Sequence, residues 1–263
     1  MKVTFRSFGA DLASSRYRAL IPQAQLGCLG VEKGHDWLVI GKHGWKWGVE
    51  TDGYRRVCFD ICDDHFSDAF AGHYRECVER ADLVTCNSHE MRRVIKDATG
   101  ADAIVIPDPY EQPEGDPRVH SRLLWFGHAT NLKDIAPWLA QLGEIELVTN
   151  VPNVAGVTQW TPEAMDGAFD RAGLVVIPTG DRWAKSGNRA IESIRRGLFV
   201  VAGYMPAYAD LGIYVGNIVD GVEWALSHER EVLRRIREAQ RYVFEEYAPH
   251  RIGKLWFKAL SEA

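Results

Sequence analysis

One polar segment, residues 181–192, is better suited to binding a ligand than any other part of the sequence. It lies between two apolar runs, 174–178 and 198–202, which predict buried strands. A helix that follows a parallel strand begins at the carboxyl edge of the sheet, where open α/β folds bind ligands. Its N-terminus offers free N–H groups and the positive end of the helix dipole, so we expect a phosphate site here.

Three side chains of this segment have the spacing of a single helix face. Lys185, Asn188 and Glu192 fall at positions i, i+3 and i+7, which lie on the same side of a helix. A cation, an amide and a carboxylate in this arrangement can hold a diphosphate and a ribose diol. The alternative is the solvated start of an ordinary helix. The buried strands on both sides favour a ligand.

Strands alternate with helices along the whole chain, which predicts α/β architecture with parallel sheets covered on both faces. We expect strands at 3–5, 37–40, 57–61, 83–86, 103–106, 123–126, 145–148, 157–160, 174–178 and 198–202. Helices are expected at 14–29, with Ser14 and Ser15 as caps, at 67–80, 88–99, 132–142, 162–171 and 221–247, in the polar segment up to about 197, and after Pro249.

The Pro-rich and acidic segment 110–117 predicts a linker between two halves of the chain. The sequence therefore predicts two doubly wound, Rossmann-like domains that face each other across a cleft. The first, at 1–112, is the acceptor side, and the second, at 118–247, is the donor side. A C-terminal helix at 248–263 is a candidate to cross back to the first domain.

The polar segment also resembles the nucleotide-sugar-binding helix of the GT-B glycosyltransferases, in a compact variant similar to glycosyltransferase family 4. The shared residues are Lys185, Ser186, Asn188, Arg189, Glu192, Gly197 and the run 200–202. Segments 80–88, 105–109 and 124–134 resemble further landmarks of these enzymes, in the same order. The resemblance implies a hexosyltransferase-like enzyme of the EC 2.4 class, with Glu192 at the donor ribose. Many retaining members carry an acid where this chain has Ala184, so the stereochemistry stays open.

The resemblance also implies which residues line the donor site. Beside Lys185, Ser186, Asn188, Arg189 and Glu192, they are Gly127, His128, Asn131, Lys133, Trp160 and Thr179. Lys185 and Arg189 would hold the diphosphate, and glycine at 127 lets the backbone approach it closely. The alternatives are an ordinary loop residue for His128, a surface lysine for Lys133 and a core side chain for Trp160.

Three carboxylates lie at or just beyond the end of the expected strand 57–61, and inverting sugar transfer needs a base for the acceptor hydroxyl. Asp60, Asp63 and Asp64 are the candidates, and Asp64 is preferred because it lies beyond the strand end. The alternative is that Asp63 or Asp64 caps the next helix. Enzymes of this fold generally need no bound metal, so we expect neither a metal nor a tightly bound cofactor.

The acceptor site is expected within the first 56 residues. They carry nine Lys or Arg against five Asp or Glu side chains, whereas the whole chain has a net charge of −5. Candidate contacts are Gly9, Ser14, Ser15, Arg16, Arg18, Lys42 and Trp45. Cations and aromatic side chains suit several partners, so the acceptor stays open between a saccharide, a small molecule and hydroxymethylated DNA.

Composition is that of a globular protein. The 263 residues are 46% hydrophobic and 25% charged, and no apolar run approaches the roughly 18 residues of a membrane span. Five cysteines at spacings unlike zinc sites predict buried thiols. Because the start also has no signal-peptide pattern, we expect a cytoplasmic location.

The leading hypothesis is a glycosyltransferase that moves a sugar from a nucleotide-diphosphate sugar, such as a UDP-sugar, to an acceptor hydroxyl. One alternative is a nucleotide-sugar epimerase of the same architecture. The other is a non-catalytic protein that binds nucleotide sugars or nucleic acid, which the alanine at position 184 keeps open.

Overall fold

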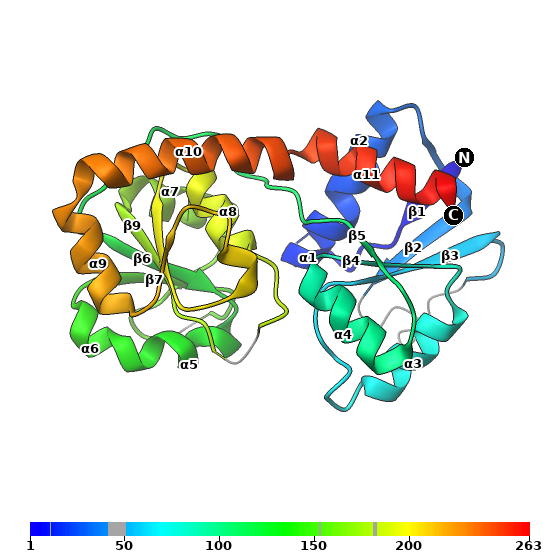
Figure 1. Ribbon diagram of the computed structural model, residues 1–263, viewed down its shortest axis with the longest axis horizontal. Helices are drawn as coiled ribbons and strands as arrows, with labels where there is room; N and C mark the ends of the chain where they lie inside the picture. Colours follow the sequence, from blue (N-terminus) through cyan, green and yellow to red (C-terminus); the bar gives the residue numbers. More distant parts are fainter. Residues whose placement is uncertain (11, 42–50, 153, 181–182) are drawn as a thin grey trace. The chain divides into compact units, whose positions relative to one another are not determined.

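The computed structural model describes residues 1–10, 12–41, 51–152, 154–180 and 183–263, and the chain divides into two compact units (Figure 1). The first unit comprises residues 1–111, 184–186 and 246–263. The second comprises residues 112–183 and 187–245. Each unit contains one sheet in which the paired strands are parallel.

The first sheet has the strand order β1-β2-β3-β4-β5. Its strands are β1 (Lys2–Phe5), β2 (Glu32–Gly41), β3 (Arg56–Ile61), β4 (Leu83–Cys86) and β5 (Ile104–Val105). The helices of this unit are α1 (Ala13–Ser15), a π-helical stretch (Arg16–Leu20), α2 (Ile21–Cys28), α3 (Ala71–Arg80), α4 (His89–Thr99) and α11 (Pro249–Glu262). Because parallel strands end at one edge, the loops after all five strands lie along that edge.

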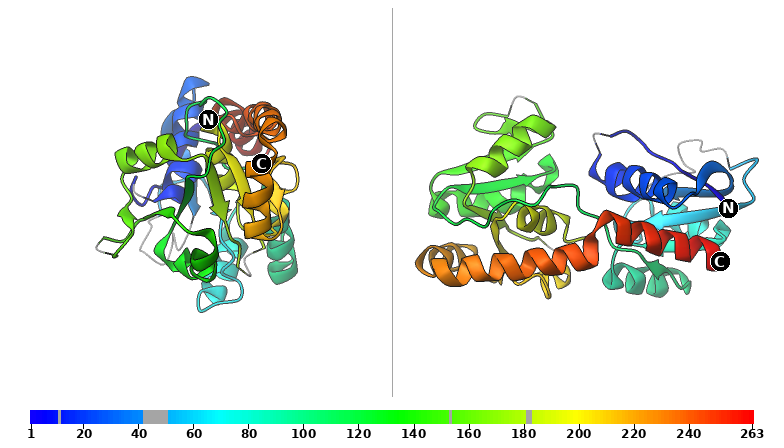
Figure 2. Two further views of the ribbon diagram at one scale, coloured as in Figure 1. Left: turned by 90° about the vertical axis from the view of Figure 1, so that its left-hand side faces the viewer. Right: turned by 90° about the horizontal axis from the view of Figure 1, so that it is seen from above.

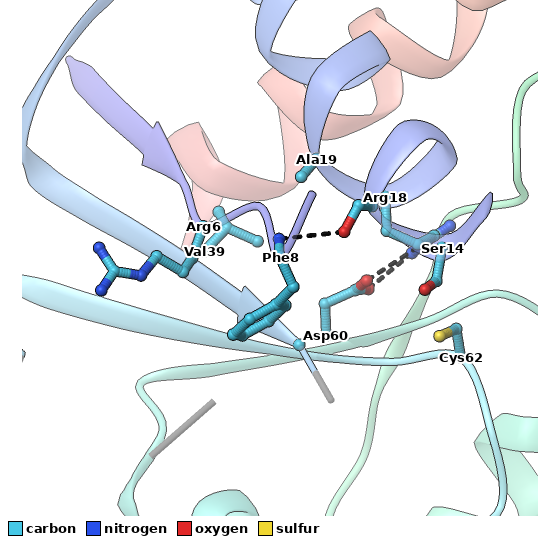
Figure 3. Close-up of a pocket in the computed structure, with 10 residues that line it drawn as sticks. Arg6, Phe8, Ser14, Arg18, Ala19, Val39, Asp60 and Cys62 are labelled. Carbon is cyan, nitrogen blue, oxygen red and sulfur yellow. Dashed lines mark hydrogen bonds and ion pairs between the residues drawn. The ribbon is translucent and has the colours of Figure 1, made fainter. Parts of the chain in front are cut away.

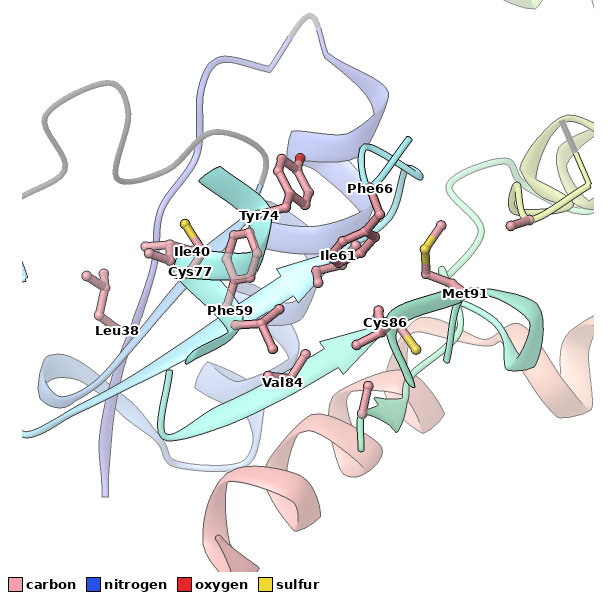
Figure 4. Close-up of a cluster of buried hydrophobic side chains, with 14 residues drawn as sticks. Leu38, Ile40, Phe59, Ile61, Phe66, Tyr74, Cys77, Val84, Cys86 and Met91 are labelled. Carbon is pink, nitrogen blue, oxygen red and sulfur yellow. The ribbon is translucent and has the colours of Figure 1, made fainter. Parts of the chain in front are cut away.

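Alternate side chains of β2 point to opposite faces of this sheet, and helices cover both faces. Trp37 and Val39 contribute to a core that is completed by α2 and α11. Leu38 and Ile40 contribute to the opposite core, with α3 and α4 (Figure 4). Trp256 of α11 is fully buried in the first core, which holds this C-terminal helix in the first unit. Removal of a side chain of this size from a core costs about 3–5 kcal/mol.

The second sheet has the strand order β11-β10-β9-β6-β7-β8. Its strands are β6 (Leu123–Gly127), β7 (Ile145–Thr149), β8 (Thr158–Gln159), β9 (Leu174–Ile177), β10 (Phe199–Ala202) and β11 (Tyr214–Val215). Its helices are α5 (Leu132–Ile135), α6 (Leu139–Leu142), α7 (Pro162–Arg171), α8 (Asn188–Arg195), α9 (Ile218–Ser227) and α10 (Glu229–Tyr247), the last of which runs on into the first unit at residue 246.

Helices also cover both faces of the second sheet, as two further views show (Figure 2). Trp125 and Val176 lie in a core shared with α5, α6, α9 and α10. Phe126 lies on the opposite face, where its ring packs edge-on against Phe169 of α7 with centroids 5.2 Å apart. The predicted α/β fold with two doubly wound parallel sheets is confirmed.

Several predicted helix bounds differ from the structure. Ser14 and Ser15 lie inside the first helical segment, which begins at Ala13, so they are not its caps. The predicted helix at 132–142 is interrupted by a 3-10 turn at Ala136–Trp138, because Pro137 has no N–H for a helical hydrogen bond. The predicted helix at 221–247 is two helices with a break at His228. The two-residue strand β11 was not expected.

Cys58, Cys77 and Cys86 are buried, as predicted. Cys28 is exposed and Cys62 is half-buried, so the prediction is wrong for these two. Within the part of the chain that the structure describes, no helix has both the length and the apolar character needed to cross a bilayer.

Candidate functional site

A buried ion network holds the carboxyl edge of the first sheet together (Figure 3). Arg18 donates through Nε and Nη2 to the two carboxylate oxygens of Asp60, at 2.8 and 2.6 Å. Its Nη1 donates to Oδ1 of Asp108 at 2.9 Å, and Thr85 Oγ1 donates to Oδ1 of Asp60 at 2.7 Å. The network joins the helical segment after β1 to β3, to β4 and to the loop after β5.

Arg18 and Asp60 therefore form a buried ion pair. Their side chains are 5% and 2% exposed. Burial by itself lowers the pKa of the Arg18 guanidinium, but the charges and hydrogen bonds of Asp60 and Asp108 outweigh it, and the net shift is upward. This geometry argues against the predicted roles of Asp60 as a base and of Arg18 as an acceptor contact. It favours a structural role for both.

A pocket of about 340 Å³, including space open to solvent, lies beside this network. Its lining includes three of the predicted acceptor residues, Ser14, Ser15 and Arg18, together with Phe8 and Cys62 (Figure 3). Ser15 is buried, and its hydroxyl accepts a hydrogen bond from Phe8 N at 3.0 Å, which shapes the loop after β1. Ser14 is therefore the more accessible hydroxyl of the two.

The other predicted acceptor residues are not part of this pocket lining. Arg16 Nε donates to Oε1 of Glu111 at 2.7 Å, and Gly9 lies in the exposed loop after β1. Lys42 and Trp45 lie outside the described residues.

Asp63, Asp64 and His65 follow β3 at the same sheet edge. Asp64 is exposed, and its Oδ1 accepts a hydrogen bond from Phe66 N at 2.9 Å in the loop before α3. Helix α3 begins at Ala71 without a side-chain cap, so the alternative that Asp63 or Asp64 caps it is wrong. His65 Nδ1 lies 2.6 Å from Oδ2 of Asp68. A carboxylate on one ring nitrogen orients a histidine so that the other nitrogen can accept a proton. The sequence reasoning missed His65, although the run Asp-Asp-His with an aspartate three residues later was a usable signal.

Lys185 is not on the helix that the spacing predicted. Helix α8 begins at Asn188 with Gly187 as its N-cap, so the prediction of one helix face through Lys185, Asn188 and Glu192 is wrong. The segment Ala184–Ser186 belongs to the first unit. There Lys185 Nζ lies 3.7 Å from Oδ1 of Asp63, with the two side chains 43% and 27% exposed.

The carboxyl edge of the second sheet carries the start of α8 and the loop after β6. Arg189, in the first turn of α8, donates through Nη1 to the carbonyl oxygen of Phe126 at 3.2 Å. A Cβ atom at Gly127 would lie 3.2 Å from the same Nη1 and 3.3 Å from the ring of Trp125. Glycine at 127 therefore lets the guanidinium lie against the end of β6, which places a cation at the predicted phosphate position.

Glu192 is 4% exposed and faces the segment that enters the second unit. Its Oε2 accepts a hydrogen bond from the backbone N–H of Gln112 at 2.9 Å. Arg195, three residues after Glu192 in α8, forms an ion pair with Glu114 at 2.9 Å. The carbonyl oxygen of Arg195 accepts a hydrogen bond from Gly115 N at 2.8 Å. Helix α8 thus holds residues 112–115 in place. Glu192 contributes to that contact through the Gln112 N–H.

The remaining predicted donor residues lie along the same edge. His128 Nδ1 lies 3.0 Å from Oγ1 of Thr130 in the turn that contains Asn131. Trp160 is half-buried after β8, and its backbone N–H donates to the carbonyl oxygen of Thr149 at 2.6 Å. Thr179 follows β9, and Lys133 is exposed in α5. Ser186 lies in the first unit, with Lys185.

No group of three or more His, Cys, Asp or Glu side chains with the geometry to hold a metal ion occurs among the described residues. The cations, amides and carboxylates of the two edges can bind phosphate and hydroxyl groups directly.

Comparison with known proteins identifies the fold. No protein-family model matches the sequence, and no curated protein matches it either. Anabaena Alr3699/HepE, solved in complex with UDP and glucose, is similar over 100% of both chains, with a TM-score of 0.78 and 12% identity. Sucrose-phosphate synthase from Thermosynechococcus elongatus is similar over 95% of this chain and 78% of that one, with a TM-score of 0.67 and 12% identity.

The S. aureus protein TarM has a TM-score of 0.63 and 11% identity over 85% of this chain. This chain spans 54% of TarM, about half of its length. At these identities the similarity shows the fold alone, and that fold is GT-B.

Proposed function

We propose that the protein is a glycosyltransferase that moves a sugar from a nucleotide-diphosphate sugar to an acceptor hydroxyl. The observation that carries the proposal is the GT-B fold, shared over the full length with a protein solved with UDP-glucose, together with Arg189 and Glu192 at the second sheet edge. The closer likeness to glycosyltransferase family 4 rests on the residues 185–192 and belongs to the same proposal.

We place the donor along the carboxyl edge of the second sheet. Arg189 and the N-terminus of α8 bind the diphosphate, since a guanidinium and free N–H groups are strong phosphate donors. Glu192 is the proposed acceptor for the ribose hydroxyls, as the resemblance of residues 185–192 implies. Trp160, after the edge strand β8, is the proposed contact for the nucleotide base. Lys185 belongs to the first unit, and its predicted contact with the diphosphate stays a prediction.

The reaction needs one proton transfer in its inverting form. The acceptor oxygen bonds to the anomeric carbon while the bond from that carbon to the diphosphate oxygen breaks, and the hydroxyl proton passes to a base. Asp64 is the proposed base, because it is an exposed carboxylate at the first sheet edge. The His65–Asp68 pair is a second candidate, which its 2.6 Å contact favours.

A saccharide or small-molecule hydroxyl is the proposed acceptor. TarM has been solved with Fondaparinux and α-GlcNAc-glycerol, and starch synthase IV of Arabidopsis thaliana with acarbose, so similar folds accommodate carbohydrates. Hydroxymethylated DNA has no comparable support. The free thiols of Cys58 and Cys86 suit a reducing, cytoplasmic compartment, which we include in the proposal.

A thermal-shift panel tests the proposal. UDP-, GDP- and ADP-sugars are compared with the matching nucleosides and with free hexoses. A ligand at one hundred times its Kd stabilises the folded state by about 2.7 kcal/mol, so one nucleotide sugar should raise the Tm while its nucleoside and the free sugar do not. The absence of a shift with every nucleotide sugar would contradict the proposal.

Transfer is then separated from the alternative activities. The selected nucleotide sugar is incubated with and without saccharide acceptors, and the products are resolved by mass spectrometry and NMR. A transferase gives a glycosylated acceptor. An epimerase changes the sugar without an acceptor, and a binding protein changes nothing.

A further inference from the structure

A large aromatic side chain stands exposed at the carboxyl edge of the second sheet. Tyr204 follows β10 and is 77% exposed, more than any other large hydrophobic side chain among the described residues. Within that part of the chain, neither its ring nor its hydroxyl has a partner, although its backbone does. An aromatic ring left in water at an edge where α/β folds bind ligands points to a contact with a ligand.

The backbone beneath this ring is fixed. Gly203 N donates to the carbonyl oxygen of Ile177 at 3.1 Å, and Thr179 Oγ1 donates to the carbonyl oxygen of Tyr204 at 3.0 Å. A Cβ atom at position 203 would lie 2.4 Å from Thr179 Oγ1, so only glycine allows β9 and β10 to end this close together. The ring therefore projects from a rigid support. Such a support reduces the entropy lost when a ligand packs on it.

The strand order suggests which part of a donor would reach this ring. Across the sheet the strands run β8, β7, β6, β9 and β10. Trp160 follows β8, Gly127 ends β6, and Tyr204 follows β10. Four strand spacings of about 4.8 Å separate the two ends of this row, roughly 19 Å in all. When the nucleotide base lies near Trp160 and the diphosphate near Gly127 and Arg189, the sugar extends toward β10.

We propose that Tyr204 stacks on the apolar face of the sugar in the bound donor and positions that sugar for transfer. This inference rests on the proposed function and assigns a residue to the sugar half of the donor site. The C–H face of a pyranose is apolar, and a phenol ring offers a flat apolar surface with a hydroxyl at its rim. Thr179, predicted as a donor contact, acts here through its hydrogen bond to the Tyr204 backbone.

Calorimetry on three variants tests this assignment. The ligands are the tightest-binding of UDP-glucose, GDP-mannose and ADP-glucose, and the corresponding nucleoside diphosphate. Tyr204→Ala should weaken binding of the nucleotide sugar by roughly 3- to 10-fold, the size of one aromatic contact. It should leave the affinity for the nucleoside diphosphate unchanged. Tyr204→Phe should keep most of the sugar affinity. Phe244→Ala removes another exposed aromatic side chain, on α10 of the same unit, and should change neither affinity.

Equal losses for the nucleotide sugar and the nucleoside diphosphate in Tyr204→Ala would show that the ring contacts the nucleotide, which overturns the inference. Unchanged affinity for both ligands would overturn it as well. Wild-type protein that binds no nucleotide sugar would instead overturn the proposed function, and the inference would fall with it.

Discussion

Arg18 binds both carboxylate oxygens of Asp60, and this buried pair connects two segments that lie 42 residues apart in the sequence. Bidentate contacts between a guanidinium and a carboxylate combine charge with fixed geometry. Arg18 also reaches Asp108, so one cation serves two acids. Removal of one member of such a network leaves a buried charge without its compensation.

Asp60→Asn should therefore destabilise the first unit by about 3 kcal/mol, at the low end of the range for a broken buried pair because Asp108 remains. Urea denaturation followed by circular dichroism measures the change. The matched control is Glu76→Gln, which removes an exposed partner of Arg80 and should cost less than about 1 kcal/mol. Equal, small effects of both substitutions would show that the buried network contributes little.

Glu192→Ala should weaken donor binding and also loosen the segment at Gln112. Loss of the acceptor for the half-buried Gln112 N–H should cost about 1 kcal/mol, and the loss of ribose contacts should reduce donor affinity by about 1–3 kcal/mol. Glu192→Gln retains an oxygen for the Gln112 N–H, so it should keep more of the wild-type stability than of the wild-type donor affinity. Denaturation and calorimetry on both variants separate the two effects. Donor affinity that follows stability in both variants would reduce Glu192 to a structural residue.

The sheets could be predicted because their strands are short apolar runs. Leu174–Ile177 is buried at every position and Phe199–Ala202 likewise, and such runs between polar segments are typical of parallel strands with two covered faces. The two residues of β11 are too few to form a pattern. The start of α8 was misplaced because residues 185–187 fit a helical spacing, whereas the chain only enters the helix at Asn188.

The site could be predicted only in part, for a physical reason. Sequence position assigns a residue to a sheet edge, and Asp64, Gly127 and Arg189 follow from that assignment. Burial and pairing depend on contacts between distant segments, such as Arg18 with Asp60, and no local pattern reveals them. The same holds for Tyr204, whose exposure depends on what the rest of the fold leaves uncovered.

Alkylation should distinguish the cysteines by exposure. Burial raises the pKa of the Cys86 thiol to about 12, above the ordinary range, so this thiol stays protonated and unreactive at pH 8. Cys28 is exposed and should be modified first by iodoacetamide in the folded protein, and Cys58, Cys77 and Cys86 only after denaturation. Peptide mass spectrometry over time gives the order. Early modification of Cys86 would contradict its burial.

Lys185→Ala should weaken nucleoside diphosphate binding by roughly 10-fold or more, because charge-assisted bonds to phosphate are lost, and leave nucleoside binding unchanged. Lys254→Ala, an exposed lysine on α11, is the control and should affect neither ligand. Calorimetry with both ligands provides the comparison. A similar loss for nucleoside and diphosphate would show that the lysine acts on structure, through Asp63, rather than on phosphate.

The identity of the general base is tested by comparing two acids that each accept a hydrogen bond from a backbone N–H. Asp64→Asn should lower turnover by roughly 10²–10⁴-fold while donor affinity survives, the range for a lost general base. Asp82 is the matched control, since its Oδ2 also accepts a backbone hydrogen bond, from Val57 N at 2.7 Å, but it lies at the start of β4. Asp82→Asn should leave turnover near the wild-type value.

His65→Gln and Asp68→Asn examine the second candidate under the same conditions. Near-normal turnover in Asp64→Asn, with large losses in both His65→Gln and Asp68→Asn, would assign the proton transfer to the histidine. Small effects in all of these variants, with donor binding intact, would rule out a base at this sheet edge and with it the inverting mechanism proposed here.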